Sequence, residues 1–344
     1  MQSNMTESTR RFPWSTVIGI LLLGALGLLL YLNRHEVEEA VRLLREARPI
    51  WVAVALACIA AGFLCAGQIY GRVLAALGHN ASIGWLTAAA MVTILINQAV
   101  PAGSVAAYAF LVASLRRRGF PVGSVAMVAG LELISWNTAV IVAFTYGLLY
   151  LLITTGLSGA AISYTAVAVA LGVLATVIYI VSRPDDTFHD WGHNVKLAVD
   201  RLFGQVWTSV QVRQVVDEIL ASRRMILEQP RRMLVLVALQ LTVFTFHSLA
   251  LDSILRALGE PAPVLSVMGA YGLALIVSVF TLLPGGGGTV EAALTVALVA
   301  QNIPLQVALG GALLFRLLSF WCLLPVGLVC YRLLTRGSAP KVER

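Results

Sequence analysis

Long apolar runs separated by short polar connections dominate the sequence. A run of about 20 apolar residues is long enough to cross the hydrocarbon core of a bilayer as a helix. Six such runs predict full membrane spans, at residues 14–32, 50–77, 122–150, 158–182, 231–258 and 305–333. The first run has no small-residue cleavage site, so it is expected to remain as a helix and not to be removed as a signal peptide. The predicted fold class is therefore an all-α, multi-pass membrane protein.

Two further apolar runs, 83–116 and 264–301, are too long for one straight helix and are interrupted in the middle. The interruptions are Pro101 with Ala102 and Gly103, and Pro284 followed by Gly285, Gly286, Gly287 and Gly288. Because proline and glycine break helices, each run is predicted to form a pair of half-helices. We expect each pair to be a re-entrant hairpin that returns to its side of entry.

The two halves of the chain repeat one another. Pro101 precedes Pro121 by 20 residues, and Pro284 precedes Pro304 by the same 20. Further positions correspond when the two halves are compared: Gly78 corresponds to Gly259, and Glu132 corresponds to Arg316 to within one residue. Each unit is a span, a broken pair and a span, and the helix between the units makes the number of crossings odd. The second unit is therefore expected to be inverted, as in alternating-access transporters.

This repeat defines the expected organisation of a single transmembrane domain. Its parts, in a domain of residues 1–344, are repeat one at about 50–150, a connecting helix at 158–182, a cytoplasmic amphipathic segment at 183–230 and repeat two at about 231–333. An apolar stripe at helical spacing within the cytoplasmic segment favours a helix on the membrane surface, although a soluble helical hairpin would show the same pattern.

Composition and charge agree with a membrane protein and exclude other classes. Hydrophobic residues make up 59% of the chain and charged residues only 12%, too few to coat a soluble surface. The net charge of +7 comes from basic residues scattered among the connections, so no nucleic-acid interface is expected. With re-entrant hairpins, most Lys and Arg residues and both termini lie in the cytoplasm of a bacterial inner membrane. The four cysteines form no metal or redox motif, and neither a metal nor a cofactor is expected.

The helix breaks suggest a ligand. A half-helix that starts inside the membrane exposes unpaired N–H groups and a partial positive charge, and both favour an anion such as phosphate. Ser104 and Thr289 could cap these starts, and the glycines after Pro284 permit close backbone approach. Four ionisable residues lie within the apolar region: Arg72, Glu132, Glu291 and Arg316. Arg72 is interpreted as extending to the membrane surface, whereas the repeat-related Glu132 and Arg316 are predicted to form a buried pair.

The sequence from Leu283 to Ala293, followed by Pro304 and Arg316, resembles the Pro-Gly-Gly-x-Gly-x-x-Glu signature of the lysylphosphatidylglycerol synthase transmembrane-region family of flippase-like proteins. Asn97 to Glu132 resembles the earlier motif of that family. Many members carry charged residues where this chain has Ser104, Tyr108 and Leu133. The resemblance and the helix breaks together give one substrate-binding set: Asn97, Pro101, Gly103, Ser104, Glu132, Pro284, Gly285, Gly286, Gly287, Gly288, Thr289, Glu291 and Arg316.

The expected function is that of a lipid transporter, or flippase, for a lipid with an anionic headgroup. The expected partners are membrane lipids, and a homodimer is also considered. The chain is not expected to be an enzyme, because it contains no nucleotide, zinc or Ser-His-Asp motif. Two alternatives stay open. One is a membrane-embedded transferase acting on a polyprenyl phosphate or phospholipid, with Glu132 or Glu291 as general base, and the other is a non-transporting partner subunit.

Overall fold

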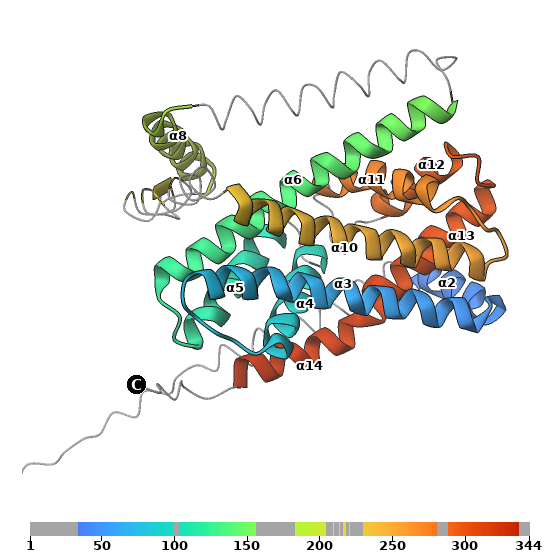
Figure 1. The fold of residues 1–344 in the computed structure, drawn as a ribbon, viewed down its shortest axis with the longest axis horizontal. Helices are drawn as coiled ribbons and strands as arrows, with labels where there is room; N and C mark the ends of the chain where they lie inside the picture. Colours follow the sequence, from blue (N-terminus) through green and yellow to red (C-terminus); the bar gives the residue numbers. More distant parts are fainter. Residues whose placement is uncertain are drawn as a thin grey trace, which may run out of the picture.

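The computed structural model describes the greater part of the chain. The described ranges are residues 34–99, 103–155, 183–203, 230–280 and 288–336, with five single positions between 203 and 230. All regular structure within these ranges is helical (Figure 1). The predicted spans 14–32 and 158–182 lie outside the described residues.

Within the described residues, four long helices are apolar enough to cross a membrane. They are α3 (Pro49–Ala76), α6 (Val122–Thr155), α10 (Pro230–Ala257) and a continuous stretch from Leu305 that comprises α13, a short π-helix and α14. Helix α3 and helix α10 each begin with proline, which is tolerated at the first helical position because the amide there needs no intrahelical partner. These helices confirm four of the six predicted spans and the multi-pass membrane class.

Both interrupted runs form two helices, as predicted. The first run gives α4 (Ile83–Ala99) and α5 (Gly103–Arg117), and the second gives α11 (Val264–Phe280) and α12 (Thr289–Val299). At 1.5 Å per residue, each of these helices is about 26 Å long or shorter, less than the hydrocarbon core of about 30 Å. Within each pair the two helices pack against one another.

Matching positions in the two halves have matching local structure. Gly78 and Gly259 both adopt the left-handed conformation, with φ of 79° and 91°, where α3 and α10 end. After each glycine, the next amide bonds back to a carbonyl five residues earlier, at 2.9 Å and 3.0 Å, which is the Schellman motif. Gly119 and Asn302, each two residues before the second proline of its unit, repeat this arrangement with φ of 85° and 64°. The two halves of the chain therefore match in local structure at these four turns.

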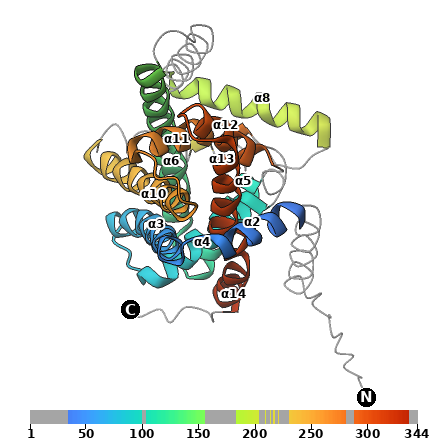
Figure 2. The same cartoon turned by 90° about the vertical axis from the view of Figure 1, so that its right-hand side faces the viewer.

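Helices from the first half of the chain pack against helices from the second half. Helix α3 packs along α10, and the two run in opposite directions, α3 starting near α2 and α10 starting near α8 (Figures 1 and 2). Helix α11 of the second unit packs on α6, and α4 of the first unit packs on α14. Small residues permit the closest of these contacts: a β-carbon at Gly272 of α11 would collide with the carbonyl oxygen of Ala143 in α6.

Two helices in the described part of the chain lie outside the two units. Helix α2 (Arg34–Glu46) precedes α3 and packs on α13. Helix α8 (Asp185–Phe203) belongs to the predicted cytoplasmic segment and lies toward the same end of the molecule as the start of α10 (Figure 1).

Candidate anion site at the start of helix α12

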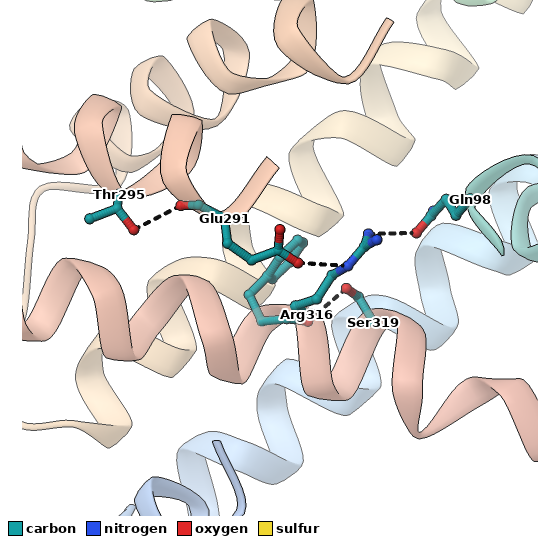
Figure 3. A network of polar contacts seen from close by, with 6 residues as sticks. Gln98, Glu291, Thr295, Arg316 and Ser319 are labelled. Carbon is teal, nitrogen blue, oxygen red and sulfur yellow. Dashed lines mark hydrogen bonds and ion pairs between the residues drawn. The ribbon is translucent and has the colours of Figure 1, made fainter. Parts of the chain in front are cut away.

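A buried ion pair joins Glu291 of α12 to Arg316 of α13. Arg316 Nε lies 2.9 Å from Glu291 Oε1, and their side chains are only 11% and 7% exposed. Arg316 Nη1 also donates a hydrogen bond of 3.0 Å to Gln98 Oε1 at the end of α4 (Figure 3). Because α4 belongs to the first unit and α12 and α13 to the second, this network connects the two halves of the molecule.

Local structure explains the position of Glu291. Gly288, the residue before α12, has φ of 80°, a left-handed conformation that favours glycine. Glu291 follows in the first turn, where a carboxylate interacts favourably with the positive end of the helix dipole. The Thr295 hydroxyl donates a hydrogen bond of 2.8 Å to the Glu291 carbonyl (Figure 3). The glycine turn therefore directs a short helix so that its first turn faces Arg316.

A π-helical segment, Leu317–Trp321, follows Arg316 directly. Its wider turn is closed by a hydrogen bond of 2.8 Å from the Cys322 amide to the Leu317 carbonyl. The Arg316 guanidinium carbon lies 4.4 Å from the centre of the Phe320 ring, a cation–π contact. The sequence predicted an uninterrupted span here. Single π-turns inside α-helices occur frequently at functional sites, and this one adjoins the charged residue of the site.

The prediction that Glu132 pairs with Arg316 is wrong. Glu132 of α6 accepts a hydrogen bond from the Tyr108 hydroxyl of α5, and the partner of Arg316 is Glu291. Tyr108 lies seven residues after Pro101, and Glu291 lies seven residues after Pro284. The Tyr108–Glu132 and Glu291–Arg316 contacts are thus counterparts, each linking a second half-helix to the span that follows. The error arose because repeat-related residues occupy equivalent places in separate units and need not meet.

The other predicted residues fall into three groups. Asn97, next to Gln98 in α4, is exposed, and Gly103 begins α5. Thr289 is the first helical residue of α12, and Gly288 holds the capping position that had been expected for Thr289. Positions outside the described residues are Pro101, Pro284, Gly285, Gly286 and Gly287, together with the side chain of Ser104.

Two residues in this region were missed by the sequence reasoning. Gln98 contacts Arg316, and its signal was a second polar residue beside Asn97 at the end of an apolar half-helix. His247 lies within the apolar span α10, with its ring among Phe63, Tyr271 and Phe315 and its Nδ1 2.9 Å from the Val243 carbonyl oxygen. Its signal was an ionisable residue inside a membrane span.

The site places a guanidinium and a carboxylate side by side in a buried position. Glu291 Oε2 is buried and has no hydrogen-bond partner among the described residues. An unsatisfied buried polar atom costs about 1–3 kcal/mol, more if it is charged. A guanidinium presents several N–H donors in one plane and can bind phosphate through two of them. Glu291 Oε2 therefore offers an acceptor to a hydroxyl or amine group of a ligand.

Long apolar helices, two broken helix pairs and a buried charged network between them define a multi-pass membrane protein. Residues 16–327 match the family described as the lysylphosphatidylglycerol synthase TM region. This match covers most of the chain, so the protein belongs to that family, as the motif at Pro284–Glu291 had indicated. The family and the membrane helices identify a lipid-related membrane protein. A search of curated proteins finds no similar sequence.

Proposed function

We propose that this protein is a flippase that moves a lipid with an anionic, phosphate-bearing headgroup across the cytoplasmic membrane. The observation that carries the proposal is the buried Glu291–Arg316–Gln98 network between the two units. A membrane protein rarely buries a guanidinium in an apolar span without a functional reason, because each such residue costs about 2.5–3.5 kcal/mol on insertion.

The depth of the network suits the middle of a transport path. Arg316 is the last residue of α13, which has 12 residues, so it lies about 17 Å along the helix from Leu305. Half of a hydrocarbon core of about 30 Å is about 15 Å. Transporters with inverted repeats bind substrate near the midplane, where broken helices from the two repeats approach one another.

Several packing features support an inverted pair of units with re-entrant hairpins. The equivalent helices α3 and α10 run in opposite directions, and the units exchange α4 and α11 across their interface. In Figure 1 the starts of α6 and α10 and the end of α14 lie toward the same end of the molecule as α8. Arg231, Arg232 and Arg336 belong to these helix ends. The positive-inside rule assigns such an end to the cytoplasm.

Lipid translocation in vesicles tests the proposal. We would reconstitute the purified protein into phosphatidylcholine vesicles containing fluorescently labelled phosphatidylglycerol and add a membrane-impermeant quencher. Wild-type protein should make the inner-leaflet label accessible faster than empty vesicles do. Arg316→Ala should slow this at least about tenfold, because a hydrogen bond to a charged group contributes about 1.5–3 kcal/mol.

A matched control and a chemical analysis make this experiment specific. Arg72→Ala removes an exposed arginine from α3 and should move lipid at the wild-type rate. Equal rates for wild type, Arg316→Ala and empty vesicles would refute the proposal. Mass spectrometry of the recovered lipids tests the transferase alternative: a covalently altered lipid would identify an enzyme in place of a flippase.

A further inference from the structure

We propose that Glu132 is a proton-binding site, and that proton uptake there loosens the contact between α5 and α6. The inference deepens the proposed lipid transport by naming the ion coupled to it, and the coupling part rests on that proposed function. The proton-binding part rests on the surroundings of Glu132 alone.

Glu132 lies well inside a membrane span. It is ten residues after Val122, the first residue of α6, and so lies about 15 Å along that helix. The Tyr108 hydroxyl of α5 donates a hydrogen bond to Glu132 Oε2. Tyr70 of α3 is buried and lies close enough to Glu132 for the two groups to interact. The carboxyl group therefore has phenol groups from α5 and α3 near it.

No cation balances this carboxyl group within the described part of the chain. Glu132 forms no ion pair there, and the titratable groups that α3 and α5 bring to it are both tyrosines. Helix α10 contributes Gln240, which contacts Ser135 of α6 at 3.5 Å. A carboxylate in a low-dielectric site without a counter-charge is costly, and uptake of a proton removes that cost.

The second unit shows the contrasting case. At the positions equivalent to Tyr108 and Glu132 it has Glu291 and Arg316, whose charges cancel. A phenol donates a hydrogen bond to a carboxylate but supplies no positive charge. The first unit therefore has a carboxyl group whose charge can change with pH, whereas the carboxylate of the second unit, Glu291, is held in an ion pair with Arg316.

Protonation has a mechanical consequence at this position. A hydrogen bond to an ionised carboxylate is roughly twice as strong as one between neutral groups. The ionised Glu132 thus holds Tyr108 and α5 against α6, and the neutral acid holds them less firmly. The Glu291–Arg316 ion pair keeps α12 against α13 in both states. Proton uptake therefore acts on the first broken pair alone, which makes transport directional when a proton gradient is present.

Infrared difference spectroscopy tests proton binding without any cargo. Protein in phosphatidylcholine nanodiscs would be titrated from acid to alkaline pH, and the carbonyl stretch of protonated carboxyl groups recorded. We expect Glu132→Gln to lose one titrating band of the wild type, and Tyr108→Phe, which removes the hydroxyl but keeps the ring, to shift that band and its midpoint. Glu291→Gln, the control that removes the buried carboxylate of the second unit, should retain the band. Identical titrations of wild type, Glu132→Gln and Tyr108→Phe would overturn the proposal, and so would a band that responds to sodium concentration and not to pH.

Lipid translocation then tests coupling. Wild-type protein in vesicles with labelled phosphatidylglycerol should change its rate with pH and respond to an imposed pH gradient, whereas Glu132→Gln should do neither. If Glu132→Gln kept the wild-type pH dependence, proton coupling at Glu132 would be refuted while lipid transport stood. If no lipid moved but the infrared band titrated as expected, the flippase proposal would fail and the proton site would stand.

Discussion

Removal of Arg316 should destabilise the protein strongly, because Glu291 would be left as a buried, uncompensated carboxylate. The two side chains are 11% and 7% exposed and their charged atoms are 2.9 Å apart. Breaking a buried ion pair by removing one partner typically costs about 3–5 kcal/mol. Arg316→Ala should also free Gln98 Oε1 from its hydrogen bond and remove the cation–π contact with Phe320.

A double-mutant cycle measures the pair itself. We expect Arg316→Ala to lose about 3 kcal/mol or more of unfolding free energy and Glu291→Gln to lose less, because its amide can still accept a hydrogen bond from Arg316. The double variant should be more stable than the sum of the single losses predicts, by about 0.5–3 kcal/mol, the range for residues in direct contact. Thermal or denaturant unfolding of the detergent-solubilised protein provides the free energies.

A second cycle distinguishes the observed pair from the one that the sequence suggested. Glu132→Gln combined with Arg316→Ala should give additive losses within about 0.5 kcal/mol, because these residues belong to separate contacts. Additivity in the Glu291–Arg316 cycle, or strong coupling in the Glu132–Arg316 cycle, would refute the arrangement described here. Arg72→Ala, which removes an exposed arginine, should change the stability by less than about 0.5 kcal/mol.

Three further predictions concern backbone conformation, helix packing and topology. Gly288→Ala should destabilise the start of α12 by about 1–2 kcal/mol and slow lipid movement, because φ is 80° at this residue. Gly123→Ala, which has open space around the added methyl group, should have neither effect. Unfolding and translocation assays compare the two variants. Gly272→Ala should cost about 1–3 kcal/mol by forcing α11 away from α6, and a loss no larger than that of Gly123→Ala would contradict the close packing. In intact cells, a cysteine replacing the exposed Arg117 should be shielded from an impermeant thiol reagent, and a cysteine replacing the exposed Asn302 should be labelled by it. The reverse pattern at either site would contradict the hairpin topology.

The sequence by itself determined the helices and their interruptions. Run length sets whether a helix can span the bilayer, and proline and glycine act on the backbone of their own neighbourhood. For this reason α3, α6 and α10 lie where hydropathy placed them, and the runs containing Pro101 and Pro284 each form two helices. The same local logic explains why the repeat extends to the glycine caps at Gly78 and Gly259.

Only the tertiary structure decided which polar residues meet. Successive residues of a helix differ by about 100° in direction, and one helical turn shifts a side chain by about 5.4 Å along the axis. The partner of Arg316 therefore depends on the rotation and depth of each helix. In soluble proteins, an apolar stripe reveals which face of a helix turns inward. Lipid tails are as apolar as leucine, so spans such as α3, α6 and α10 carry no pronounced stripe of this kind. The choice of Glu291 and Gln98 over Glu132 therefore depends on how the two units pack together.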